Sequence, residues 1–132
     1  MRSLLSAPIL LAALAVPAAA QSRWKEVGKT ASGNSVYVDP RSVKTANGII
    51  TAKVRVKFTE PVKTDNGAWR SSQVTAMFDC AKSTVAAKES AYYSDDAGTK
   101  VVEHSVNPKP GFGPAIGGSM TKVMLDYVCK KK

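Results

Sequence analysis

Strict alternation of apolar and polar residues over positions 49–59 constrains the fold of this chain more than any other feature. The apolar positions are Ile50, Ala52, Val54, Val56 and Phe58, and the polar positions between them are Thr51, Lys53, Arg55, Lys57 and Thr59. A period of two residues is typical of a β-strand with one buried and one solvated face. Asn47-Gly48 before it and Asp65-Asn66-Gly67 after it suit tight hairpin turns. The segment therefore predicts a long antiparallel strand flanked by hairpins.

Other β-type segments lie on both sides of this strand. We predict strands at residues 23–27, 35–38, 68–79, 84–93 and 99–105, with Asp39-Pro40 ending the second of these. The connections are too short for parallel crossovers, which favours an antiparallel meander of six strands. Residues 108–118 hold three Pro and four Gly, so we expect an irregular loop there.

The last part of the chain predicts an amphipathic helix. Ser119 is a suitable N-cap, and the apolar stripe that follows consists of Met120, Val123, Met124, Tyr127 and Val128. We interpret this stripe as a core face and not as a cofactor site. The expected fold class is α+β, with an antiparallel six-stranded meander-type sheet and a C-terminal α-helix packed on one face.

The N-terminus is typical of a secretory signal peptide over residues 1–20. Arg2 precedes an apolar stretch at residues 4–16, and small residues at 18–20 suit cleavage before Gln21. The alternative, a transmembrane anchor, is disfavoured because the stretch falls short of the roughly 20 residues needed and contains Pro8 and Pro17. We expect an exported single domain at residues 21–132, in the periplasm or outside the cell, with no transmembrane segment and no lipid-anchoring cysteine.

Cys80 and Cys129 are the two cysteines of the chain. Export places them in an oxidising compartment, where a disulfide between them is favoured. Closing the loop of about 50 residues between them stabilises a fold by about 4 kcal/mol in the chain-entropy model. A redox-active or metal-binding thiol pair is the alternative, but the Cys-x-x-Cys spacing that such pairs commonly have is missing.

Positive charge is the feature that bears most directly on binding. The chain has 19 Lys and Arg against 10 Asp and Glu among 132 residues, a formal net charge of +9. Lys53, Arg55 and Lys57 share the polar face of the long strand, and Lys44, Lys63 and Arg70 are candidate neighbours. Such a row attracts anionic partners; the alternative is a solvated face that discourages aggregation. Export excludes nucleic acid. The partners that remain are anionic glycans, lipopolysaccharide, anionic lipid head groups or an acidic protein, of the cell envelope or of a host.

Catalytic and metal-binding patterns are weak. His104 is the single histidine of the chain. Ser105 beside it and Asp79 or Asp126 elsewhere could complete a catalytic triad in principle, but the sequence has no Gly-x-Ser-x-Gly motif to support one. Haem ligation by His104 with Met77, or by Tyr92 or Tyr93, is a further alternative. We predict no enzyme, no metal site and no cofactor.

Several short motifs occur in an informative order. They are Trp24-x-x-Val27-Gly28, Val36-Tyr37-Val38-Asp39-Pro40, Phe78-Asp79-Cys80, and Gly118-Ser119 before a helix that ends at Val128-Cys129. In this order the chain resembles the surface-adhesin protein E family of Gram-negative bacteria. The resemblance implies a curved antiparallel sheet of about six strands with a disulfide-bonded C-terminal helix. The surface protein that gives the family its name binds host extracellular-matrix proteins and haem, and none of its binding residues is carried over to a position in this chain.

These observations together predict a non-catalytic binding protein that works in the periplasm or at the cell surface. Two other functions stay open from the sequence. One is a structural or accessory subunit of an envelope complex, and the other is a host-matrix adhesin, which requires display at the cell surface.

Overall fold

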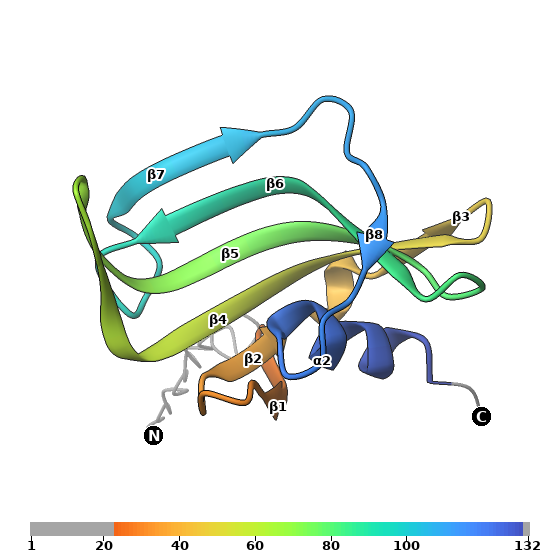
Figure 1. Cartoon of the computed structure of the whole chain (residues 1–132), viewed down its shortest axis with the longest axis horizontal. Helices are drawn as coiled ribbons and strands as arrows, with labels where there is room; N and C mark the ends of the chain where they lie inside the picture. The colour runs from red at the N-terminus through yellow and green to blue at the C-terminus, as the bar shows by residue number, and fades with distance from the viewer. Residues whose placement is uncertain (1–22, 131–132) are drawn as a thin grey trace, which may run out of the picture.

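A computed structural model describes residues 23–130 of the chain, so the predicted signal peptide lies outside the described residues. The elements are β1 (Lys25–Lys29), β2 (Ser35–Val38), the 3₁₀ helix η1 (Pro40–Ser42), β3 (Lys44–Ala46), β4 (Ile49–Thr64), β5 (Gly67–Asp79), β6 (Thr84–Tyr93), β7 (Val101–Val106), β8 (Gly113–Pro114) and α2 (Met120–Val128) (Figure 1). The main strand order is β1-β2-β4-β5-β6-β7, and every pairing is antiparallel. The predicted six-stranded meander is confirmed.

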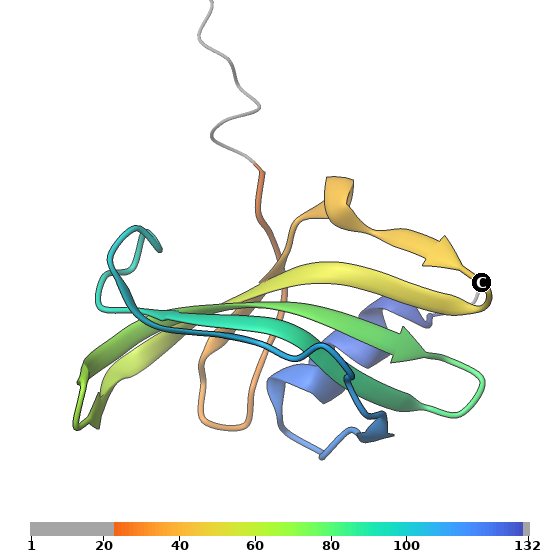
Figure 2. The same ribbon diagram turned by 90° about the horizontal axis from the view of Figure 1, so that it is seen from above.

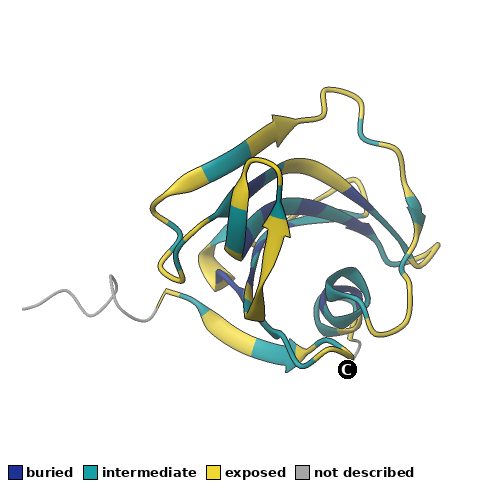
Figure 3. Cartoon of the chain, turned by 60° about the vertical axis from the view of Figure 1, so that its left-hand side comes forward, coloured by how far each residue is buried: buried dark blue, intermediate teal, exposed yellow. Residues whose placement is uncertain are grey.

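The sheet is twisted and curls around helix α2 (Figures 2 and 3). We call the side that packs on α2 the inner face and the opposite side the outer face. Side chains alternate along β4, so Val54 and Val56 lie on the inner face while Lys53, Arg55 and Lys57 lie on the outer face. The alternation in the sequence therefore separates a core from a candidate binding surface.

The core lies between the inner face and α2. Its fully or nearly fully buried members include Val36, Val38, Ala52, Val54, Val74, Ala76, Phe78, Met124 and Leu125. A helix of nine residues is too short to be stable alone, so its stability comes from this packing. Gly28 of β1 permits the close approach of the helix, since a Cβ there would lie 2.8 Å from the Val123 Cγ1 atom. The predicted helix on one face of the sheet is confirmed.

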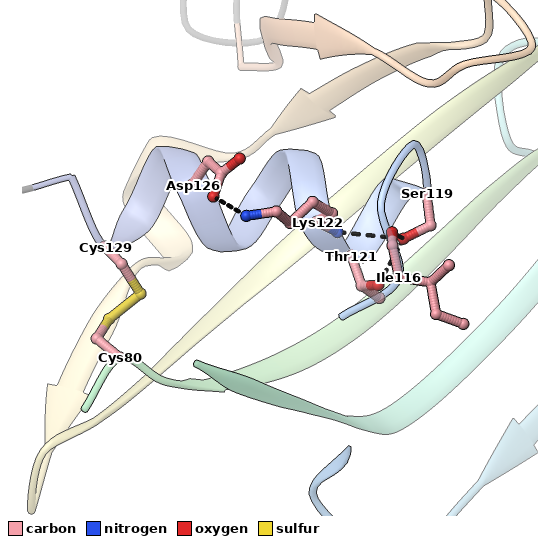
Figure 4. A network of polar contacts seen from close by, with 7 residues as sticks. All are labelled: Cys80, Ile116, Ser119, Thr121, Lys122, Asp126 and Cys129. Atoms are coloured by element: carbon pink, nitrogen blue, oxygen red, sulfur yellow. Dashed lines mark hydrogen bonds and ion pairs between the residues drawn. A yellow bond between two sulfur atoms is a disulfide. The ribbon is translucent and has the colours of Figure 1, made fainter. Parts of the chain in front are cut away.

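Both ends of α2 are fixed by side chains. The Ser119 Oγ atom accepts a hydrogen bond of 3.3 Å from the Lys122 amide and so caps the N-terminus (Figure 4). At the C-terminus, Cys129 forms a disulfide with Cys80, which directly follows β5, and their Cα atoms are 5.5 Å apart. The expected disulfide is present, and it joins segments 49 positions apart in the chain.

Two of the predicted turns have the expected backbone. Asn47 and Gly48 have φ angles of 53° and 79°, the positive values that a two-residue hairpin turn requires. After β2, the Asp39 carboxylate caps η1 by accepting a hydrogen bond of 3.1 Å from the Arg41 amide. Proline and aspartate thus end β2 as predicted, and the short helix leads the chain into β3.

The predicted boundaries are wrong at several places. β4 continues to Thr64 beyond an irregularity between Lys57 and Val62 that interrupts its alternation. β1 and β7 extend further toward the C-terminus than predicted. Residues Lys44–Ala46 form a strand that the sequence analysis did not predict. All three residues are exposed, so they carry no apolar pattern that could have indicated it. Gly113–Pro114, expected to be irregular, pairs with Thr84 and Val85 of β6.

Candidate functional site

The outer face brings polar side chains of four strands together. Lys53 of β4 is paired with Thr75 of β5, which is paired with Glu89 of β6. Two residues further along β4, the corresponding row runs from Arg55 through Gln73 and Ala91 to His104 of β7. Residues in register on one face of a sheet are neighbours, so these two rows form a continuous polar surface.

Lys53 lies at the edge of a hollow of about 410 Å³ on this surface. The lining residues are Lys53, Gln73, Thr75, Glu89, Ala91, Tyr93, Val101 and His104. The backbone of Lys53 is held by the segment around η1. The Lys53 amide donates a hydrogen bond to Ser42 Oγ at 2.8 Å, and the Lys53 carbonyl accepts one from the Asp39 amide at 3.1 Å. Within residues 23–130 no carboxylate lies within 4.0 Å of its ammonium group, so this charge is available to a ligand.

Lys57 is exposed and lies next to an aromatic ring. Its Nζ atom is 5.5 Å from the centroid of the Tyr37 ring, a cation–π distance. Lys44 is paired with Thr51 and so lies at the other end of the same face. Lys63 lies beyond the irregularity in β4, toward the β4–β5 turn, and Arg70 of β5 lies opposite that irregularity. The basic surface therefore includes Lys44, Lys53 and Lys57.

Arg55 has a different environment from the two lysines. Its guanidinium donates a hydrogen bond to the Ala97 carbonyl and lies 5.2 Å from the centroid of the Trp24 ring. The turn between β6 and β7 folds over the outer face, and Ser71, which is fully buried, donates to the Asp95 carbonyl at 2.7 Å. Arg55 is thus engaged within the protein, between the N-terminal segment and this turn.

The turn over Arg55 is stabilised by one carboxylate. Asp95 accepts hydrogen bonds from the Thr99 side chain and from the Thr99 and Lys100 amides. These bonds, that of the Thr99 side chain foremost, lower the pKa of Asp95 from 3.8 to about 2, because they favour the charged carboxylate. We interpret Asp95 as a turn residue that positions the segment over Arg55.

His104 is paired with a carboxylate on the outer face. Its Nε2 atom is 2.7 Å from the Glu89 Oε2 atom, and both side chains are about half exposed. Ser105 is on the opposite face of β7 from His104, because successive residues of a strand alternate. Met77 is paired with Ala86, about 15 Å along β6 from the partner of His104. The geometry thus brings His104 next to neither Ser105 nor Met77.

The described part of the chain contains no group of three or more His, Cys, Asp or Glu side chains arranged to hold a metal ion. It also contains no helix that is both long enough and apolar enough to cross a membrane.

The inner face contains a second hollow that sequence analysis missed. A cleft of about 400 Å³ lies beside the core, between the N-terminus of α2, the β1–β2 turn and the part of the β4–β5 hairpin that is near its turn. Its lining residues are Thr30, Ser32, Asn34, Val56, Phe58, Val62, Trp69, Ser72, Val74, Tyr92, Gly118, Ser119 and Met120. The rings of Trp69 and Tyr92 are stacked, with centroids 3.8 Å apart.

A curled antiparallel sheet with a disulfide-bonded C-terminal helix on its inner face defines the architecture of this small domain. Residues 24–130 match the sequence profile of the surface-adhesin protein E family, and the chain belongs to that family. The family resemblance noted in the sequence is confirmed.

Solved structures support the same fold. The chain is similar to crystal form II of Haemophilus influenzae protein E, with 15% sequence identity, a TM-score of 0.58, and coverage of 90% of this chain and 96% of that chain. Another structure of Haemophilus influenzae protein E has 16% identity and a TM-score of 0.55, and the match covers 88% of this chain and 90% of that one. A comparison with curated protein sequences gives no match.

Proposed function

We propose that the chain is an exported, non-catalytic binding protein of the cell envelope that holds an anionic glycan on its outer face. The proposal includes cleavage of residues 1–20 as a signal peptide and a single domain at residues 21–132. The observation that carries it is the position of Lys53, whose ammonium group lies at a polar hollow without a carboxylate partner among residues 23–130.

The Lys53 ammonium group favours a negatively charged ligand, and the neutral polar groups around it favour a ligand that also has hydroxyl groups; Glu89, the carboxylate of the same lining, is paired with His104. Gln73, Thr75 and Tyr93 line the same hollow and supply neutral donors and acceptors. Lys57 lies four residues further along β4, which places its Cα atom about 13 Å from that of Lys53. Two cationic groups at that spacing, with hydroxyl-binding groups beside one of them, suit an extended polymer with repeated charges.

Binding to heparin, a sulfated glycan, tests the proposal. The double variant Lys53→Glu/Lys57→Glu is expected to bind immobilised heparin about tenfold or more weakly than the mature protein, because both cationic contacts become repulsive. The matched control Lys82→Glu/Lys88→Glu changes the net charge equally but alters exposed lysines of the β5–β6 turn and β6 that do not line the hollow beside Lys53. Its binding should stay within about twofold of the mature protein's.

A second arm distinguishes a glycan from a lipid. Vesicles containing phosphatidylglycerol present anionic head groups without a glycan polymer, and they should compete weakly with heparin. If both double variants lose heparin binding equally, the interaction follows net charge alone and the proposed site is wrong. If the vesicles bind more tightly than heparin, the ligand is an anionic lipid surface instead.

Host-matrix adhesion is a second candidate function, and membership of the surface-adhesin protein E family favours it. It requires display of the chain outside the cell. Antibody labelling of intact cells should then detect the protein, whereas labelling only after the outer membrane is permeabilised would contradict adhesion and agree with a periplasmic binding role.

A further inference from the structure

The inner-face cleft contains hydrogen-bonding groups that the protein itself does not use. Ser72 is 4% exposed and lines the cleft, and none of the hydrogen bonds found within residues 23–130 involves its hydroxyl group. Trp69 also lines the cleft, and its indole Nε1–H is buried without an acceptor in the same part of the chain. Buried polar groups are normally paired, because an unpaired group loses its hydration without gaining a hydrogen bond in exchange. The buried, unpaired indole N–H of Trp69 and the neighbouring hydroxyl group of Ser72 therefore indicate a place where a ligand supplies a hydrogen-bond acceptor.

The shape and chemistry of the cleft restrict what that ligand can be. The volume of about 400 Å³ is in the range of sites for small organic molecules. Its walls carry the apolar side chains of Val56, Phe58, Val62 and Met120 and the stacked pair of Trp69 and Tyr92. None of the lining side chains is charged, so an ion entering the cleft would lose hydration without gaining a counter-charge.

We propose that this cleft is a binding site for an uncharged small molecule that has a flat apolar ring and a hydrogen-bond acceptor oxygen. The ring packs on the apolar walls, and the oxygen accepts a hydrogen bond from Ser72. The site is separate from the anion-binding surface, because the cleft lies on the inner face and Lys53 and Lys57 lie on the outer face. The two proposals therefore fail or succeed independently.

The neutral fluorophore 6-propionyl-2-(dimethylamino)naphthalene is a suitable probe, because it combines a flat ring with one carbonyl oxygen. Titration into the mature protein should give saturable binding at one site with a blue-shifted emission. Ser72→Ala should weaken binding about fivefold, the effect of one lost hydrogen bond. Val62→Lys places an ammonium group at the cleft mouth, where Val62 is 39% exposed, and should weaken binding by more than about tenfold.

The matched control is Val106→Lys, which makes the same substitution at an exposed valine of β7 that does not line the cleft. This variant should bind the probe like the mature protein. Unchanged thermal unfolding of Val62→Lys shows that its loss of binding is local.

Four outcomes would overturn the proposal. The first is the lack of saturable binding by the mature protein, and the second is equal binding by Val62→Lys and Val106→Lys. The third is tighter binding of the anionic probe 1-anilinonaphthalene-8-sulfonate that Val62→Lys strengthens further, since the site would then prefer anions. Sedimentation of the mature protein as a dimer that Val62→Lys dissociates would likewise overturn it, because a second copy would then fill the cleft.

Discussion

Removal of the disulfide is the perturbation whose effect the structure specifies best. Cys80 and Cys129 are separated by 49 positions, and the double variant Cys80→Ala/Cys129→Ala opens that loop in the unfolded chain. The chain-entropy model then predicts a loss of about 4 kcal/mol in the free energy of unfolding. Since small domains have a net stability of about 5–15 kcal/mol, the variant keeps its fold only narrowly.

The structure also predicts where the loss appears first. Helix α2 is held by the disulfide at one end and by burial of Met124 and Leu125 in its middle. Nine residues do not sustain a helix in water, so without the covalent link α2 undocks and reforms more often than the sheet unfolds. Amide hydrogens of residues 124–128 should therefore lose more protection from exchange than those of the central strands β4 and β5.

Urea unfolding and amide hydrogen exchange test this prediction together. In thermal unfolding, we expect the Tm of the double variant to fall by about 15–20 °C, in agreement with the loss in unfolding free energy measured in urea. Wild-type protein treated with a reductant is the control, because it opens the same loop without altering side-chain volume. A loss below about 1 kcal/mol, with α2 amides as protected as before, would refute the reasoning.

Three further predictions follow from single residues. Asp39→Ala removes a buried carboxylate that is bonded to side-chain and backbone donors, and should lower the unfolding free energy by about 2 kcal/mol in urea titrations. Gly28→Ala places a Cβ 2.8 Å from Val123, forces α2 away from β1, and should cost about 1–2 kcal/mol in the same assay. The lowered pKa of Asp95 means that its stabilising effect is complete above its ordinary pKa of 3.8 and is lost as the pH falls through about 2. An NMR titration of the Asp95 carboxyl should give that midpoint, and Thr99→Val should raise it.

The strand pattern was predictable because it depends on local sequence. Alternation at residues 50–58 predicted the burial of Ala52, Val54 and Val56, and the structure confirms it. Prediction failed where that signal stopped. β3 is exposed throughout, and the two-residue β8 is paired through its position in space and not through its own propensity.

The candidate site was only partly accessible from sequence for a similar reason. Lys53, Arg55 and Lys57 repeat at every second position and look equivalent in the sequence. Arg55 differs from the two lysines because its guanidinium donates a hydrogen bond to the carbonyl of Ala97, which lies 42 positions away in the sequence. The β6–β7 turn brings Ala97 over the sheet, and no local pattern indicates this contact. The inner-face cleft was missed because Ser72 and Trp69 approach Met120 only through the tertiary fold.

The position of α2 in the chain has a consequence for how the protein is made. The helix is the last described element to leave the ribosome, and it covers β1 and β2, which are the first. Until it is synthesised, the inner surfaces of Val36 and Val38 have no cover. A chain that stops before Gly118 therefore exposes the apolar inner face of the sheet to other protein molecules. Docking of α2, and not formation of the hairpins, is therefore the step that covers the apolar inner face.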